Sequence, residues 1–278
     1  MTIREALRLA AARLEQAGVP DADVDAAYLL ASVLKEDTLA MRINGHRELA
    51  APQRAAFDAL CDRRAAREPL QYILGETEFM GLTFHVEPGV LIPRADTEIL
   101  VEKALEWMKP GARVLDIGTG SGAIAVSLAK LGRQAQVTAV DVSDRALKIA
   151  RQNAERNGAA VEFVKSDCFS ALKGRKYDMI VSNPPYISED EMRELMPEVT
   201  REPELALFGG ADGLDFYRRI SREAPEYLNE GGCLLFEIGW LQKDAVSALV
   251  KAHIGEPFAL RDYGQNWRVV GARKEDAC

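Results

Sequence analysis

The sequence has few of the residues that build metal or disulfide sites. It contains 4 cysteines and 3 histidines among 278 residues. The cysteines, Cys61, Cys168, Cys233 and Cys278, are far apart and include no CxxC pair. This spacing provides neither a zinc ligand set nor a disulfide framework. We therefore expect reduced, mostly buried thiols and no metal.

Long apolar runs and an excess of positive charge are also missing. No stretch approaches the roughly 18 apolar residues of a membrane span, and charges interrupt the apolar pattern of the N-terminus, which excludes a signal peptide. Acidic residues outnumber basic ones, 43 to 35. This balance argues against a phosphate backbone as the main partner. We expect a soluble, cytoplasmic protein that binds neither membrane nor nucleic acid.

The N-terminal quarter of the sequence has the pattern of apolar residues that is typical of helices. Apolar residues over 2–67 recur at helical spacing, interrupted by Gly, Pro and Asp. Thr2 and Glu5 have the spacing of a capping box, and Gly18 is a natural helix stop. Positive and negative charges nearly cancel in this segment. We predict a small helical bundle over residues 1–74 that docks a protein partner.

The next segment predicts a β-hairpin. In "FMGLTFHVEPGVLIPR", near-alternating apolar residues flank the turn residues "EPG". We expect this hairpin to form a linker over residues 75–98. Phe79 and Phe84 are expected to fill a core rather than contact a substrate.

Strands and helices alternate over residues 99–278, which predicts one large domain. Apolar or β-branched strands are expected at 113–118, 137–141, 161–167, 177–183 and 233–239. Helical patterns between them imply a parallel sheet covered on both faces, with ligands at the carboxyl ends of the strands. The last two runs, "FALRDY" and "WRVVGAR", are predicted to pair antiparallel at one edge.

The stretch "LDIGTGSGAIA" predicts a nucleoside-bearing cofactor. Gly118, Gly120 and Gly122 lie where a strand turns into a helix, and Asp141 ends the next strand, placed to accept from ribose hydroxyls. The glycine spacing also fits a dinucleotide site. Asp116 favours S-adenosylmethionine because it would meet an ammonium group and repel a diphosphate. Asp167 would accept from the adenine amino group or, alternatively, cap the following helix.

The motif "NPPY" follows the fourth predicted strand, where the order of an open α/β sheet places the reacting centre. Asn183 can accept one hydrogen bond from a planar nitrogen, and the Pro184 carbonyl can accept a second. Pro185 fixes the backbone that aims this carbonyl. Tyr186 can stack on the flat group. The two acceptors would free the nitrogen lone pair for attack on a methyl group without a strong base.

The chain resembles the PrmC/HemK family of protein-(glutamine-N5) methyltransferases. The resemblance rests on "DIGTGSG", "NPPY", the linker "PLQYILGETEFMGLTFHVEPGVLIPRADTE" and the helical N-terminal region, and it covers nearly the whole chain. It implies methylation of the glutamine in the Gly-Gly-Gln loop of class-I release factors. The family often has "RPETE" where this chain has "RADTE", and often a tryptophan beside the adenine at the position of Cys168.

The residues and the resemblance together define the expected site and fold. The fold is a Rossmann-like class I methyltransferase sheet with a helical bundle and a hairpin linker, the cofactor is S-adenosylmethionine with S-adenosylhomocysteine as product, and the chain is expected to be a monomer. The expected cofactor residues are Asp116, Gly118, Thr119, Gly120, Ser121, Gly122, Asp141, Asp167, Cys168 and Asn183. The expected catalytic and substrate-binding residues are Asn183, Pro184, Pro185 and Tyr186, with Arg94 and Glu237 as further substrate contacts.

Several alternatives stay open. Arg94 could instead pair with Asp96 or Glu98, and Glu237 could hold a loop. An adenine-N6 nucleic-acid methyltransferase would use the same "NPPY" acceptors on a flipped base. A scaffold that only binds a cofactor is the third class, which the intact motif disfavours.

Overall fold

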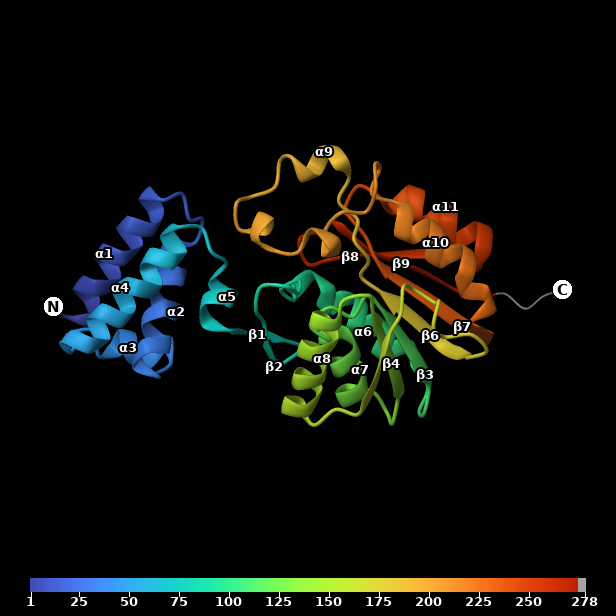
Figure 1. Cartoon of the computed structure of the whole chain (residues 1–278), viewed down its shortest axis with the longest axis horizontal. Helices are drawn as coiled ribbons and strands as arrows, with labels where there is room; N and C mark the ends of the chain where they lie inside the picture. The colour runs from blue at the N-terminus through green and yellow to red at the C-terminus, as the bar shows by residue number, and fades with distance from the viewer. Residues whose placement is uncertain (275–278) are drawn as a thin grey trace. The chain divides into compact units, whose positions relative to one another are not determined.

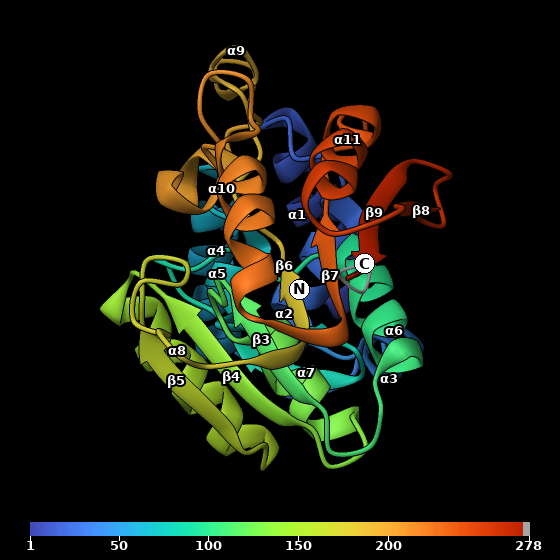
Figure 2. The same ribbon diagram turned by 90° about the vertical axis from the view of Figure 1, so that its right-hand side faces the viewer.

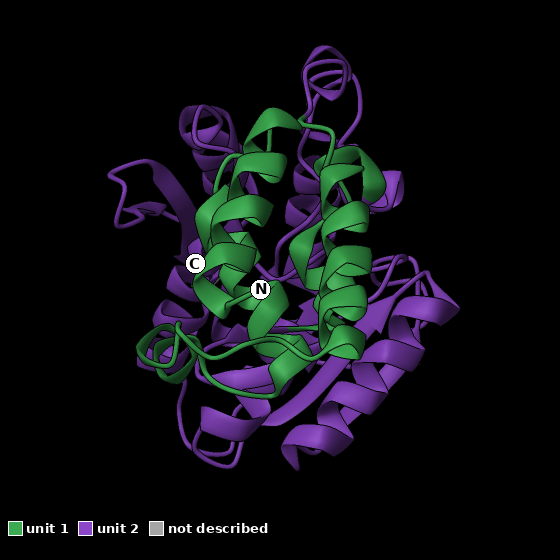
Figure 3. Cartoon of the chain, turned by 90° about the vertical axis from the view of Figure 1, so that its left-hand side faces the viewer, with its two compact units in different colours: residues 1–76, 196–201 green, residues 77–195, 202–278 purple. Residues whose placement is uncertain are grey.

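The computed structural model describes residues 1–274, so Cys278 lies outside the described residues. The chain divides into two compact units, coloured in Figure 3. We call residues 1–76 together with 196–201 the helical unit, and residues 77–195 together with 202–278 the sheet unit. Each is described by itself.

The helical unit is a bundle, as predicted. Its helices are α1 (Ile3–Gln16), α2 (Ala22–Leu34), α3 (Thr38–Ile43), α4 (Ala51–Ala65) and α5 (Leu70–Leu74) (Figure 1). The predicted capping box is present, because the Glu5 amide donates to Thr2 Oγ1 at 3.3 Å and the Thr2 amide donates to Glu5 Oε2 at 2.8 Å. A core that includes Leu14, Leu30 and Phe57 holds the helices together.

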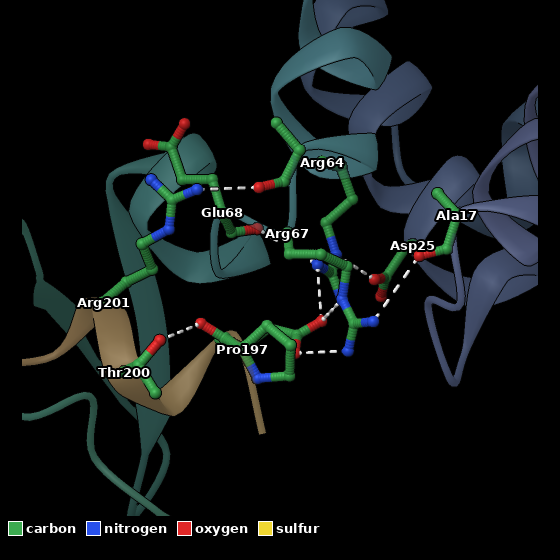
Figure 4. Close-up of polar contacts among 10 residues, drawn as sticks. Ala17, Asp25, Arg64, Arg67, Glu68, Pro197, Thr200 and Arg201 are labelled. Carbon is green, nitrogen blue, oxygen red and sulfur yellow. Dashed lines mark hydrogen bonds and ion pairs between the residues drawn. The ribbon is translucent and has the colours of Figure 1, made fainter. Parts of the chain in front are cut away.

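A short segment from much later in the chain, residues 196–201, completes the helical unit. Glu198 forms ion pairs with Arg64 at 2.9 Å and with Arg67 at 2.6 Å. Figure 4 labels the two arginines and, from the short segment, Pro197. Arg64 also donates to Asp25 Oδ2 at 2.6 Å. The arginines are 6% and 20% exposed, so these charges are partly removed from water. Their pairing with Glu198 fixes the segment in this unit.

The hairpin exists, but its turn lies earlier than the sequence suggested. Strands β1 (Glu76–Phe79) and β2 (Leu82–His85) form a two-stranded sheet joined by Met80 and Gly81. These two residues have φ of 52° and 69°, the left-handed pair that a two-residue hairpin turn requires. The "EPG" residues, 87–89, instead begin an irregular segment after β2. Alternation alone did not distinguish the two turns.

The sheet unit contains a seven-stranded sheet in the order β5-β4-β3-β6-β7-β9-β8. Its strands are β3 (Arg113–Ile117), β4 (Gln136–Asp141), β5 (Val161–Lys165), β6 (Tyr177–Ser182), β7 (Leu228–Glu237), β8 (Phe258–Arg261) and β9 (Trp267–Arg273). The first five are parallel, and β9 runs antiparallel to both β7 and β8. This confirms the predicted strands and the antiparallel edge pair.

Helices cover both faces of this sheet, as Figures 1 and 2 show. On one face lie α6 (Glu98–Trp107), α7 (Ala123–Leu131) and α8 (Asp144–Asn157), and on the other lie α10 (Asp215–Glu223) and α11 (Lys243–His253). Because side chains alternate along a strand, Val114 packs into one core and Leu115 into the other. Phe79 and Phe84 are buried in the first core, as expected.

The thiols of Cys61, Cys168 and Cys233 are free and buried, as predicted. Within residues 1–274, no helix combines the length and the apolar character needed to cross a membrane.

Candidate active site

The candidate site lies at the carboxyl ends of β3 and β6. These strands are neighbours, although the chain runs from β3 outward to β4 and β5 before it returns to β6. Such a reversal of strand order opens a crevice in which open α/β sheets bind ligands. A cavity of about 140 Å³ is present there. Of the predicted residues, it is lined by Gly118, Gly120, Asp141, Asp167, Cys168, Asn183, Pro184 and Pro185.

The glycine loop after β3 has the geometry of a cofactor loop. Gly118 and Gly120 have φ of 75° and 54°, and a Cβ atom added to either would meet no atom within 4 Å. At both glycines, no side chain covers the backbone that lines the cavity, so a ligand can approach it closely. Gly122 has a different reason to be glycine, since its Cβ would lie 3.0 Å from that of Ala150 on α8.

Two further loop residues support this backbone without lining the cavity. Thr119 Oγ1 donates to Asp116 Oδ2 at 2.7 Å. The carbonyl of Ser121 accepts from Asn153 Nδ2 at 2.8 Å, and the same amide group donates to the His85 carbonyl at 3.0 Å. Asn153 is fully buried on α8 and thus ties the loop to β2. Sequence reasoning missed it, because an asparagine inside a helical pattern carries no local signal.

Asp116 carries a buried carboxyl oxygen without a partner. Its Oδ1 has no hydrogen bond within the described chain. Burial raises the pKa of Asp116 to about 7, while the hydrogen bond from Thr119 opposes the shift. A buried acceptor left unsatisfied costs free energy. An ammonium group brought to this oxygen would satisfy it and restore the charged form.

Asp141 holds the glycine loop. Its Oδ2 accepts from the Gly120 amide and its Oδ1 accepts from the Ser143 amide, both at 2.9 Å. Burial raises the pKa of this carboxyl, and the two backbone donors oppose the shift. Each oxygen keeps a further lone pair, so the carboxylate can still accept from ribose hydroxyls at the cavity.

Asp167 and Cys168 follow β5 at the cavity wall. The Asp167 carboxylate does not cap a helix, because turns rather than a helix follow it; its Oδ1 accepts from Arg219 Nη1 at 2.6 Å. Cys168 has a φ of 48° and a buried thiol. Burial raises the pKa of this thiol to about 11, so the sulfur stays protonated near neutral pH. Contact of either residue with adenine stays a prediction.

The "NPPY" residues present two acceptors. Asn183 Nδ2 donates to Thr97 Oγ1 at 3.3 Å. Within residues 1–274, neither Asn183 Oδ1 nor the Pro184 carbonyl accepts a hydrogen bond. Tyr186 does not line the cavity. Burial raises its pKa to about 12, which keeps the hydroxyl protonated and excludes it as a base near neutral pH.

The loop "GGADG", residues 209–213, packs on the backbone of this motif. A Cβ on Gly209 would lie 2.6 Å from the Pro185 carbonyl oxygen, and one on Gly213 would lie 2.2 Å from that of Tyr186. Gln242 Nε2 also donates to the Tyr186 carbonyl, at 2.9 Å. The cluster of glycines is the sequence signal for this contact, but no local pattern links it to "NPPY".

The two weaker candidates have specific partners. Arg94 pairs with Glu202, whose side chain is 2% exposed, rather than with Asp96 or Glu98. Glu237 ends β7 with a buried carboxyl, and burial raises its pKa to about 7. Neither residue lines the cavity. A substrate contact for either stays a prediction.

A mostly parallel seven-stranded sheet with a glycine loop at its strand reversal is the fold of a Rossmann-like methyltransferase. A crystal structure of a methyltransferase from Pyrococcus furiosus has this fold, with a TM-score of 0.57 and 23% identity over 71% of this chain and 91% of that one. Residues 82–204 match the methyltransferase small domain, and residues 5–75 match the PrmC N-terminal domain.

Curated relatives narrow the class to one family. A release factor glutamine methyltransferase of Geobacter sulfurreducens is 46% identical over 274 residues, covering 98% of this chain and 96% of that protein. One of Cereibacter sphaeroides is 44% identical over 277 residues, covering 98% and 99%. The chain belongs to the release factor glutamine methyltransferase family.

Proposed function

We propose that this chain transfers a methyl group from S-adenosylmethionine to the side-chain amide nitrogen of the glutamine in the Gly-Gly-Gln loop of class-I peptide chain release factors. The observation that carries the proposal is the pair of free acceptors, Asn183 Oδ1 and the Pro184 carbonyl, beside the cofactor loop. A primary amide has two N–H donors and therefore matches this pair.

The residues present fit the cofactor. Asp116 offers an unsatisfied buried oxygen for the amino group, and Gly118 and Gly120 leave the backbone open to the ligand. Asp141 keeps acceptor capacity for the ribose. When bound, S-adenosylmethionine supplies an electrophilic methyl group. Asp116, Asp141 and the intervening loop would hold it next to Asn183.

The chain's own residues orient the substrate nitrogen. Asn183 Oδ1 and the Pro184 carbonyl accept hydrogen bonds from the two N–H groups of the substrate amide. These hydrogen bonds draw the nitrogen toward tetrahedral geometry, which frees its lone pair. The nitrogen would then form a bond to the methyl carbon as the bond from that carbon to the sulfonium sulfur breaks, which leaves S-adenosylhomocysteine, and the nitrogen would lose one proton to water. Orientation by these acceptors carries the catalysis. Since Tyr186 stays protonated near neutral pH, the hydroxyl of this motif does not act as the base.

Transfer of labelled methyl groups tests the proposal. Purified protein and methyl-labelled S-adenosylmethionine are incubated with a class-I release factor, with the same factor carrying Asn in place of the Gly-Gly-Gln glutamine, or with duplex DNA. We expect one methyl group per molecule of the first substrate and none in the other two. Labelling of the DNA alone would establish the adenine-N6 alternative and refute the proposal.

The proposal assigns docking of the release factor to the helical unit, because a site that grips only a primary amide cannot distinguish one exposed glutamine from another. Deletion of residues 2–67 should preserve cofactor binding and sharply reduce methylation of whole release factor. The deletion removes Arg64 and Arg67, so it is made in a Glu198→Gln background that leaves no unpaired carboxylate. Full activity of the folded, truncated protein would exclude the docking role. We also propose that the protein acts in the cytoplasm as a monomer.

A further inference from the structure

The orientation of the Asn183 side chain is set from outside the "NPPY" motif. Its Nδ2 donates to Thr97 Oγ1, at 3.3 Å. Thr97 is only 5% exposed and ends the 3-10 helix η1 (Ala95–Thr97), immediately before α6. The contact joins residues 86 positions apart in the chain. It leaves the amide oxygen, rather than the amide nitrogen, free for a substrate.

A buried carboxyl lies behind this pair. Glu237 is 2% exposed, and within the described chain its Oε2 has no hydrogen-bond partner. Its backbone carbonyl accepts from the Tyr217 hydroxyl at 2.9 Å, which fixes the end of β7. Burial raises the pKa of Glu237 to about 7, while hydrogen bonding from Thr97 and Asn183 lowers it. The register of the parallel strands β6 and β7 pairs Ser182 with Phe236, so Asn183 and Glu237 come next at the ends of neighbouring strands.

Charges from other elements act on the same carboxyl. Arg268 on β9 lowers the pKa of Glu237, and Asp96 on η1 raises it. Arg268 is itself paired with Asp96 at 3.1 Å and with Asp262 at 3.0 Å, so its charge is shared with two carboxylates. Glu237 in turn raises the pKa of Tyr186.

The side-chain amide of asparagine has an acceptor oxygen on one side and an NH2 donor group on the other. One orientation offers an oxygen to the substrate nitrogen, and the flipped orientation offers N–H groups that would face the N–H groups of the substrate. An ionised carboxylate accepts hydrogen bonds and donates none. It therefore favours the orientation in which Nδ2 points toward Thr97 and Glu237. A hydrogen bond to a charged group changes an equilibrium by roughly ten- to a hundredfold.

We propose that Thr97 and Glu237 are positioning residues that hold the Asn183 amide with its oxygen toward the substrate nitrogen. This inference rests on the proposed function and deepens it. Protonation of Glu237 adds an O–H donor, from which the oxygen of the flipped amide can accept a hydrogen bond. Turnover should therefore fall as the pH drops below about 7, the pKa of Glu237.

The kinetic test uses Thr97→Val, Thr97→Ser and Glu237→Gln in the full chain. Thr97→Val and Glu237→Gln should each lower kcat roughly ten- to a hundredfold, with little change in KM or in affinity for S-adenosylhomocysteine. Thr97→Ser keeps the hydroxyl and should stay near wild type. The fall in kcat below about pH 7 should be lost in Glu237→Gln. Loss of folding or of cofactor binding in Glu237→Gln would mean that the carboxyl serves the fold instead.

A double-mutant cycle tests whether these residues act through Asn183. In an Asn183→Ala background, Thr97→Val and Glu237→Gln should cause no further loss of kcat. Losses that multiply across the two backgrounds would overturn the inference. The wild-type arm tests the proposed function separately, because absence of release-factor methylation there refutes that function without reference to Thr97.

If the wild-type protein does not methylate release factor, a measurement without substrate still tests the positioning of Asn183. In the NMR spectrum of the complex with S-adenosylhomocysteine, the side-chain N–H protons of Asn183 should show a nuclear Overhauser effect to the Thr97 methyl group. Glu237→Gln should weaken this signal. An unchanged signal in Glu237→Gln would refute the role of the carboxylate.

Discussion

The pairing of Glu198 with two arginines should contribute measurably to the stability of the helical unit (Figure 4). Arg67 donates to both oxygens of Glu198 at 2.6 Å, and Arg64 contacts Oε1 at 2.9 Å. The Glu198 side chain is 15% exposed, so solvent screens these contacts only partly. Burial raises the pKa of Glu198, but hydrogen bonds from Arg67 and Arg64 outweigh it and bring the pKa to about 2.

The size of the effect follows from this pKa. The ordinary value is 4.5, so folding lowers the pKa by about 2.5 units, and each unit corresponds to about 1.4 kcal/mol. The ionised carboxylate therefore contributes about 3 kcal/mol. Gln is uncharged and has the shape of protonated Glu. Glu198→Gln should accordingly lower the free energy of unfolding by about 2–4 kcal/mol near pH 7.

The same reasoning fixes the pH dependence. Because the pKa is lower in the folded state, the stabilisation is fully present above about 4.5 and is lost as the pH falls toward 2. Wild type should therefore approach Glu198→Gln in stability under acid conditions, with the difference at pH 3 reduced to about half of that at pH 7.

Urea unfolding at several pH values measures this difference. All three tryptophans, Trp107, Trp240 and Trp267, belong to the sheet unit, so their fluorescence follows that unit, whereas circular dichroism follows the helices of both. Glu194→Gln is the matched control, because Glu194 is exposed and has no ion pair among the described residues. A difference below about 0.5 kcal/mol, or one that does not change with pH, would refute the reasoning.

Three further substitutions test the site. Asn183→Ala should lower turnover by about two or more orders of magnitude and leave affinity for S-adenosylhomocysteine within a few fold, as single-turnover kinetics and calorimetry would measure; near-normal turnover would remove Asn183 from the mechanism. Asp141→Ala should cost about 2–4 kcal/mol of calorimetric cofactor affinity, and unchanged affinity would limit Asp141 to holding Gly120. Gly213→Ala should reduce turnover by shifting the Tyr186 backbone, because its Cβ would lie 2.2 Å from that carbonyl oxygen; an unaltered rate would show that the backbone moves freely.

The features that the sequence predicted depend on local patterns. The parallel strands follow from apolar runs separated by helical periods, and the glycine loop and "NPPY" were recognised because each occupies a strand end. The site assembles because β3 and β6 are neighbours in the sheet. Strand order is not local, but right-handed crossovers restrict it enough for the reversal to be expected.

What sequence reasoning missed depends on contacts between distant residues. Asn183 meets Thr97 across 86 positions, and Arg67 meets Glu198 across 131. No periodicity links such pairs, and Thr97 and Glu198 look locally like an ordinary helix-start residue and a surface acid. The hairpin turn was misplaced for another reason. Proline and glycine at 87–89 are the stronger turn signal, yet Met80 adopts a left-handed φ of 52°.

The segment of residues 187–209 follows the "NPPY" motif and contains the short helix α9 (Glu189–Met192). Its ends are joined, because the Ile187 amide donates to the Leu207 carbonyl and the Gly209 amide donates to the Ile187 carbonyl, both at 2.9 Å. Its middle, 196–201, belongs to the helical unit, while Pro203 and Leu205 line the cavity. The chain therefore runs from the helical unit directly into the segment 202–205, which contributes to the lining of the cavity, in addition to its connection at residues 76–77.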